Sequence, residues 1–117
     1  MDKVAFYKKI VRELAAEVAQ MSEAVDKPIE LLRAFDDDRG QYLIYFDGWK
    51  GERRFYGCFF HIEVQTDGKI WVRHDGTELD ITQLLLSKGV PKNDIVLAFQ
   101  SPPARRLISI EEGYAVD

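Results

Sequence analysis

The spacing of apolar residues divides the chain into one long helix followed by a series of strands. Near the N-terminus, apolar positions recur every three or four residues, which is the spacing of one face of a helix. Asp2 is a suitable N-cap, and Pro28 marks the helix end because the residue before a proline avoids the helical region. The stripe consists of Val4, Tyr7, Val11, Leu14, Val18, Met21 and Val25, widened by Phe6 and Ile10.

This stripe also repeats every seven residues, which leaves two interpretations open. Three heptads are few for a coiled coil. We therefore expect the helix to lie on the domain's own sheet. The alternative is a seam with another subunit or a partner.

Beyond Pro28, short apolar runs separated by turn residues predict strands. Asp67-Gly68 is typical of a two-residue type I′ hairpin turn, which pairs Val64 with Trp71 and His61 with His74. The predicted strands are 29–35, 41–46, 53–65 and 69–75, with an acidic turn at 36–40 and a longer loop at 47–51. The register places Tyr56, Cys58, Phe60, Ile62, Val64 and Trp71 on the face beneath the helices.

The last part of the chain predicts a second helix and one more strand. Thr77 is the expected N-cap, and Gly89 with Pro91 marks the helix end. A strand at 95–99 follows, and the tail from 105 to 117 carries weak signals. The expected fold class is α+β, an antiparallel β meander over 42–78 packed against a long N-terminal helix and a second, shorter helix.

The composition fits one domain spanning residues 1–117, since 46% of the residues are hydrophobic and a second core would be too small. The single cysteine, Cys58, excludes an intrachain disulfide, and no zinc-type Cys/His spacing occurs. The N-terminal pattern is not that of a signal peptide, and no apolar run approaches the roughly 20 residues of a membrane span. We therefore expect a cytoplasmic protein without a membrane anchor.

The charge balance disfavours direct contact with DNA. With 20 acidic and 16 basic residues, the net charge is −4, which repels phosphate polymers. Local groups of basic and aromatic residues are the exceptions, although a solvated rim is the simpler interpretation of each. The candidates for contact with a partner or with DNA are Trp49, Lys50, Arg53, Arg54, Arg105 and Arg106.

Two histidines are the residues whose predicted placement comes nearest to a catalytic or metal site. His61, His74 and Glu63 fall on one sheet face, and two imidazoles with a carboxylate suit a metal or acid–base chemistry. A zinc site needs a third firm ligand and an oriented outer shell, so ordinary cross-strand packing is favoured. The acidic turn at 36–38 lacks the ligand spacing of a calcium loop, and Cys58 is expected to face the core.

Known catalytic motifs are missing from the sequence. A Walker loop, a dinucleotide-binding glycine fingerprint, a nucleophile elbow and an HExxH helix are all absent. We therefore expect a protein that is not an enzyme and that needs no cofactor.

An ordered series of short motifs runs through the chain. The series is Gly48-Trp49, Arg53-Arg54, Gly57-Cys58, His61-Ile62, Asp67-Gly68-Lys69-Ile70-Trp71, His74-Asp75-Gly76-Thr77-Glu78 and Gly89-Val90-Pro91-Lys92-Asn93-Asp94-Ile95-Val96-Leu97. It resembles the XisI family, the fdxN element excision controlling factors of filamentous cyanobacteria, over nearly the whole chain.

The resemblance implies an accessory role in programmed excision of a DNA element that interrupts a nitrogen-fixation operon. Such a factor works with a separate recombinase and with a companion protein, XisH, which looks like a nuclease-fold protein. The expectation is a non-enzymatic subunit that binds a XisH-like partner and meets DNA only through partners; a homo-oligomer is compatible with it. The alternatives are direct DNA binding through Lys50, Arg53, Arg54, Arg105 and Arg106, and a metal-dependent hydrolase at His61, Glu63 and His74.

Overall fold

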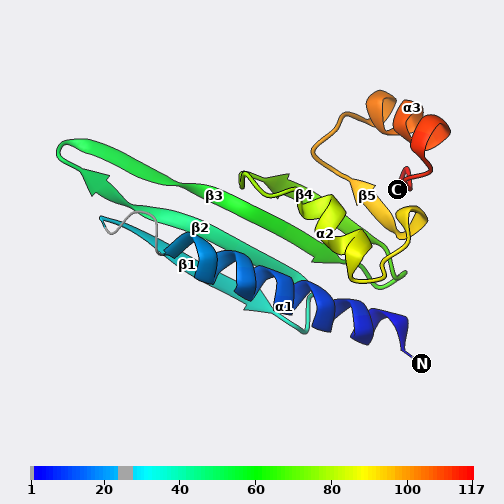
Figure 1. The fold of residues 1–117 in the computed structure, drawn as a ribbon, viewed down its shortest axis with the longest axis horizontal. Coiled ribbons are helices and arrows are strands. Elements are labelled where there is room, and N and C mark those ends of the chain that lie inside the picture. The colour runs from blue at the N-terminus through cyan, green and yellow to red at the C-terminus, as the bar shows by residue number, and fades with distance from the viewer. Residues whose placement is uncertain (1, 24–27) are drawn as a thin grey trace.

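The fold is a five-stranded sheet with a long helix lying along one face (Figure 1). The computed structural model describes residues 2–23 and 28–117. Its elements are α1 (Lys3–Glu23), β1 (Ile29–Asp36), β2 (Gln41–Lys50), β3 (Arg53–Val64), β4 (Ile70–Asp75), α2 (Ile81–Ser87), a 3-10 turn (Lys92–Asp94), β5 (Ile95–Leu97) and α3 (Pro102–Glu112). Strands β1 to β4 are antiparallel neighbours in chain order, and β5 pairs with β4 in parallel. The predicted α+β class and the antiparallel meander are confirmed.

Helix α1 packs on the domain's own sheet, against β1, β2 and β3, as predicted. Its first turn is capped by Asp2, whose Oδ1 accepts hydrogen bonds from the backbone N–H groups of Val4 at 3.0 Å and Ala5 at 3.2 Å. The buried positions are Tyr7, Ile10, Val11, Leu14, Ala15, Val18 and Ala19. Among the described residues, no helix is long and apolar enough to cross a membrane.

Some predicted members of the helix stripe are not in the core. Phe6 is 43% exposed and Met21 is 57% exposed. The small residues Ala15 and Ala19 are buried instead, because small side chains let the helix approach the sheet closely. Val25 and the expected helix end fall on residues 24–27, outside the described residues.

The predicted loop at 47–51 is wrong, because β2 continues to Lys50 and pairs there with Arg53, the first residue of β3. Gly48 suggested a turn but lies inside the strand. A Cβ atom at Gly48 would lie 2.5 Å from the carbonyl oxygen of Pro28, so this glycine permits close approach of the neighbouring backbone. The result is a longer hairpin than the sequence predicts.

The turn between β3 and β4 also differs from the prediction, because its loop has three residues, 66–68. Only Gly68 has a positive φ, +87°, and its N–H donates to the carbonyl oxygen of Gln65 at 3.0 Å. Val64 therefore pairs with Ile70 rather than with Trp71. A shift of one residue reverses the faces of a strand, so Ile70 is buried and Trp71 lies on the opposite face.

A β-bulge on β4 corrects the register further along the hairpin. The pairing shifts between Ile62–Val72 and His61–His74, which leaves Arg73 as the extra residue. The predicted pairing of His61 with His74 is thus confirmed, although the turn used to predict it was wrong.

A second bulge lies on β3, where Phe59 is the extra residue between the pairs Phe60–Ile44 and Cys58–Tyr45. Phe60 is buried beneath α1, but beyond the bulge Cys58 is exposed and Tyr56 is 61% exposed. The prediction that Tyr56 and Cys58 face the core is therefore wrong. The extra residue reverses the alternation of the strand at this point.

Helix α2 connects the parallel strands β4 and β5 and shares the core with α1. Its N-cap is Asp80, whose side chain accepts from the N–H of Gln83 at 3.2 Å, so the predicted cap Thr77 is wrong. The predicted C-terminus is confirmed: Gly89 has a φ of +95°, and the N–H of the next residue, Val90, donates to the carbonyl oxygen of Leu85.

Helix α3 was not predicted. Ser101 caps it, two prolines occupy its first turn, and Gly113 ends it in the left-handed conformation. None of its residues is buried, so the periodic burial that marks other helices is missing. After α3, the chain returns to the sheet, where Ala115 forms a bridge with Val96 of β5.

Asp94 joins the first turns of α1 to the start of β5. It is 8% exposed and accepts a 2.5 Å hydrogen bond from the Tyr7 hydroxyl, while the Lys3 ammonium lies 3.0 Å from its Oδ2. Burial, with Asp94 beside it, raises the pKa of Tyr7 to about 12. This contact gives a structural role to the acidic residue in the motif at 89–97.

The raised pKa of Tyr7 predicts a loss of stability at alkaline pH. An unfolded tyrosine ionises near pH 10.0, whereas folded Tyr7 holds its proton to about 12. The stabilisation is therefore complete below the unfolded pKa and is lost as the pH rises through this window. Urea denaturation from pH 8 to 12 should show a smaller alkaline loss for Tyr7→Phe than for the wild type. Tyr56→Phe is the control, and equal profiles for the two variants would contradict the prediction.

Two glycines in tight turns differ in the space around them: Gly40 lies between β1 and β2, and Gly51 lies between β2 and β3. Gly40 (φ +66°) and Gly51 (φ +60°) both adopt the left-handed conformation, so alanine costs about 1 kcal/mol at each. At Gly40 the new Cβ would also lie 2.2 Å from the carbonyl oxygen of Val64, whereas nothing lies within 4 Å at Gly51. In urea denaturation, Gly40→Ala should lower the free energy of unfolding by a further 1–3 kcal/mol, roughly. Equal losses for the two variants would show that the clash is absent.

Candidate interaction surface

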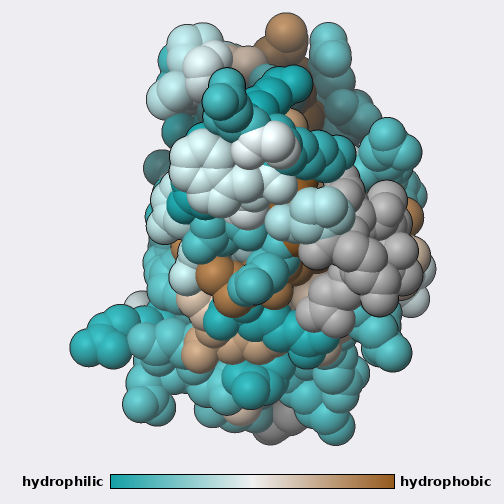
Figure 2. Space-filling model, turned by 90° about the vertical axis from the view of Figure 1, so that its left-hand side faces the viewer, coloured by the Kyte–Doolittle hydropathy of each residue, from teal (hydrophilic) through white to brown (hydrophobic). Residues whose placement is uncertain are grey.

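The end of the β2–β3 hairpin forms an arm, defined here as residues 47–56, at one end of the molecule's 46 Å long axis (Figure 1). Trp49 pairs with Arg54, and Lys50 pairs with Arg53. The structure therefore brings together four of the predicted contact residues. Viewed from the side on which the arm lies, hydrophilic side chains dominate, with small apolar patches between them (Figure 2).

Arg54 is the centre of a stacked cluster on one face of the arm. Its guanidinium carbon lies 5.3 Å from the ring centroid of Trp49 and 5.0 Å from that of Tyr56. Its Nη1 lies 2.5 Å from Asp47 Oδ1 and donates to the carbonyl oxygen of Gly48 at 3.2 Å. Trp49 remains 55% exposed and Tyr56 61% exposed. A fixed, exposed group of Trp, Tyr and Arg has the composition of a protein-binding hot spot.

The basic residues of the arm are accompanied by acidic ones. Arg53 and Lys50 lie 4.7 Å and 5.5 Å from the ring centroid of Phe55. The carboxylates of Asp47, Glu52 and Glu30 are carried by the arm itself and by the paired strand β1. A cleft of about 340 Å³ beside the stack is lined by Pro28, Glu30, Asp47, Gly48, Trp49 and Arg54. This mixed charge suits a protein surface better than a phosphate backbone.

The remaining basic candidates do not join this surface. Arg105 and Arg106 lie on α3, at the other end of the molecule from the arm (Figure 1). The five basic residues expected to contact DNA therefore form two separate groups.

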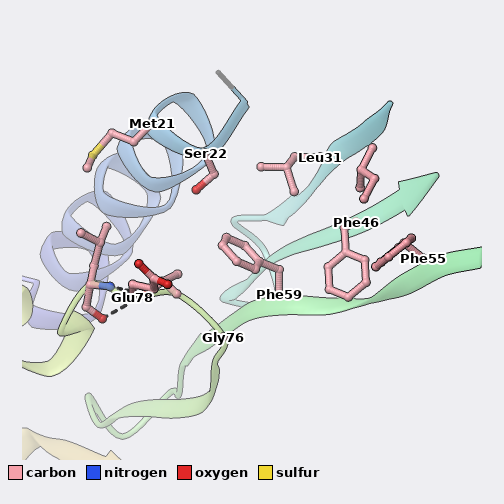
Figure 3. Close-up of a pocket in the computed structure, with 11 residues that line it drawn as sticks. Met21, Ser22, Leu31, Phe46, Phe55, Phe59, Gly76 and Glu78 are labelled. Atoms are coloured by element: carbon pink, nitrogen blue, oxygen red, sulfur yellow. Dashed lines mark hydrogen bonds between the residues drawn. The ribbon is translucent and has the colours of Figure 1, made fainter. Parts of the chain in front are cut away.

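An apolar cavity of about 630 Å³ opens between the C-terminal turn of α1, strands β1 to β3 and the segment 76–79 (Figure 3). The rings of Phe46, Phe55 and Phe59 line the sheet side, while Ser22 and Glu78 supply polar groups on the other side. The sequence did not predict this cavity, because Phe59 faces it only as a result of the bulge on β3. The signal in the sequence was the density of phenylalanines between 46 and 60.

The predicted histidine group is assembled only in part. His61 and His74 are cross-strand partners, but His61 Nε2 lies 2.7 Å from Gln41 Oε1, and Arg73 donates to Glu63 at 2.7 Å. Burial, and then the charge of Arg73, lower the pKa of His61, so its neutral form is favoured. Within the described ranges, no group of three or more His, Cys, Asp or Glu side chains is placed to hold a metal ion. The alternative of a metal-dependent hydrolase therefore has no set of metal ligands among the described residues.

Cys58 lies on the exposed face rather than in the core. Its thiol donates to the carbonyl oxygen of Phe60 at 3.5 Å. Partial burial raises the pKa of the Cys58 thiol, which is the opposite of the shift that activates a nucleophile.

The acidic turn at 36–38 has structural partners. The backbone N–H of Arg39 donates to Asp36 at 3.0 Å and is the main cause of the lowered pKa of that carboxyl. Asp37 accepts from the Tyr42 hydroxyl at 2.7 Å and from Arg12 at 3.0 Å. Asp37 thus holds the turn against β2 and α1, while Asp36 stabilises the turn itself.

Comparisons with known proteins agree with this fold over its whole length. The model of a family described as XisI protein matches residues 1–116. A XisI-like protein from Anabaena variabilis is 31% identical, with a TM-score of 0.86 over 97% of this chain and 99% of the other. The fdxN element excision controlling factor XisI from the same organism is 29% identical, with a TM-score of 0.84 over 99% and 100%. No match is found among curated proteins. The chain belongs to the XisI family.

Proposed function

We propose that this chain is a non-enzymatic accessory factor for the excision of a DNA element, and that it binds a protein partner through the arm. Family membership supports the excision role, since one solved relative is named as an excision controlling factor. The stack of Trp49, Arg54 and Tyr56 carries the proposal of a protein contact.

The geometry of the stack favours tight contact. Arg54 is held by two rings, a carboxylate and a carbonyl oxygen, so little side-chain entropy is lost when a partner binds. The exposed rings of Trp49 and Tyr56 offer large apolar surfaces at fixed positions. Both properties are found in the few residues that dominate protein–protein affinity.

We assign the partner role to a XisH-like protein, and the cutting and joining of DNA strands to a separate recombinase. The acidic balance of the chain, with a net charge of −4, supports contact with DNA through partners. The separation of Arg105 and Arg106 from the arm supports it as well, because it divides the positive charge between two ends of the molecule.

Co-purification with a XisH-like protein tests the proposal. The wild type should associate, and Trp49→Ala or Arg54→Ala should weaken the affinity by about 30-fold, the effect of losing one hot-spot residue. Arg39→Ala is the matched control, because Arg39 is also an exposed arginine paired with an aspartate, Asp36. Failure of the wild type to associate would reject the partner, and association that survives both arm variants would reject the arm.

A DNA-binding measurement on the isolated protein separates the alternative. We expect no binding to duplex DNA at 50 mM salt. Binding that falls steeply between 50 and 200 mM salt would support direct DNA recognition instead.

A further inference from the structure

The two faces of the arm carry different charges. Lys50 and Arg53 are cross-strand partners, and both lie against the ring of Phe55 on one face. Trp49 and Arg54 form the adjacent cross-strand pair and therefore project from the opposite face. The face that carries the stack of Trp49 and Arg54 is thus separated from the other two basic residues of the arm.

Two carboxylates lie opposite each other on the side of the stack. Glu30 of β1 pairs with Asp47 of β2, which is two residues before Trp49 and therefore on the same face. Like charges directly opposite in a sheet destabilise the pairing. Arg54 compensates Asp47, but Glu30 is exposed and forms no ion pair with any of the described residues. One uncompensated negative charge is therefore retained beside an exposed indole.

These side chains share the cleft beside the stack. Glu30, Asp47, Trp49 and Arg54 all line its volume of about 340 Å³. Trp49 lies on β2, between Arg54 on β3 and Glu30 on β1. A ligand can reach both the indole, which is 55% exposed, and the Glu30 carboxylate from solvent. Two carboxylates and one guanidinium leave the cleft with one negative charge in excess.

This combination indicates a cation with a flat surface. An exposed ion pair alone contributes little to affinity, because water screens it. The ring of Trp49 adds a cation–π contact and excludes water from one side of the cleft. A guanidinium can use both groups at once, since it stacks on aromatic rings and donates two parallel hydrogen bonds to a carboxylate. A lysine ammonium supplies the charge without the flat surface, and a calcium ion needs roughly six or more oxygen ligands.

We propose that the cleft binds an arginine side chain of the protein partner, with its guanidinium stacked on Trp49 and paired with Glu30. The proposal rests on the arm being a protein-binding surface, and it specifies the chemistry that the partner presents there. Arg54 already combines the ring of Trp49 with the carboxylate of Asp47, so the same combination is feasible with Glu30 on the side of β1. Because Asp47 compensates Arg54, the second guanidinium meets little repulsion.

Nuclear magnetic resonance of the full chain tests the cleft, because Trp49 and Trp71 are its only tryptophans. The probes are three acetylated tripeptide amides, Gly-Arg-Gly, Gly-Lys-Gly and Gly-citrulline-Gly, at constant ionic strength. Citrulline keeps the planar shape of arginine without its charge. The arginine peptide should shift the Trp49 indole signal saturably and leave the Trp71 indole unchanged. The lysine peptide should bind more weakly than the arginine peptide, and the citrulline peptide at least about tenfold more weakly.

The variant Glu30→Gln separates binding from a structural role, because it removes the uncompensated charge and also the like-charge pair with Asp47. It should bind the arginine peptide about tenfold more weakly, yet its midpoint of urea denaturation should equal or exceed that of the wild type. A residue that only stabilised the sheet would lower this midpoint. Glu52→Gln is the matched control, because Glu52 is an exposed glutamate of the same arm outside the cleft, and this variant should retain binding.

Four outcomes would overturn the proposal. An equal response of the two indoles, or no saturable shift of Trp49, would show that the cleft is not a specific site. Equal affinity for the arginine and citrulline peptides would show that charge is not recognised. Unchanged affinity in Glu30→Gln would show that this carboxylate is not the partner of the guanidinium. Displacement of the arginine peptide by magnesium chloride at constant ionic strength would identify a metal site instead.

Co-purification with a XisH-like protein distinguishes this proposal from the function on which it rests. Binding of the arginine peptide by a chain that does not retain a XisH-like protein would reject that partner and support the cleft. Association that is weakened in Trp49→Ala but unchanged in Glu30→Gln would support the arm and reject the cleft.

Discussion

The packing of α1 against one face of β1 to β3 is the interaction on which the rest of the structure depends. A helix of 21 residues is roughly 32 Å long, whereas the 12 residues of β3 extend to roughly 40 Å. The helix therefore cannot cover the whole hairpin. The uncovered end becomes the arm, where Trp49, Arg54 and Tyr56 are displayed. The apolar cavity opens nearby, at the C-terminal turn of α1, where Met21 and Ser22 line it.

Two one-residue insertions, the bulge at Phe59 and the third residue of the turn before β4, decide which side chains pack beneath the helix and which lie outside the core. The bulge at Phe59 directs Phe59 into the cavity and leaves Tyr56 on the open face beside Arg54. The three-residue turn before β4 directs Trp71 outward, where Arg105 of α3 covers it. The placement of Tyr56 and of Trp71 outside the core therefore results in each case from a change of register by one residue. In a sheet with one covered face, such a change moves a side chain from the core to the surface.

The two ends of the molecule present different chemistry. The arm offers exposed rings around Arg54, which pairs with Asp47, whereas at the α3 end Arg105 stacks on Trp71 and forms no ion pair with the described residues. The motif at 89–97 has a different purpose, because Asp94 joins α1 to β5 and thereby holds the sheet and the helix in one unit.

Local features were predictable from the sequence because short-range contacts determine them. The α1 stripe, the Asp2 cap and the Gly89 helix end each depend on residues within one or two turns, and so does the proximity of Trp49 and Arg54 across a short hairpin. The register of β4, the bulges at Phe59 and Arg73, and the contact of Arg105 with Trp71 depend on residues far apart in the chain. Burial of a whole sheet face selects among registers that the local sequence leaves nearly equal. Helix α3 shows the same division, since its caps lie in the sequence but only the tertiary structure determines that Arg105 faces inward and Leu107 outward.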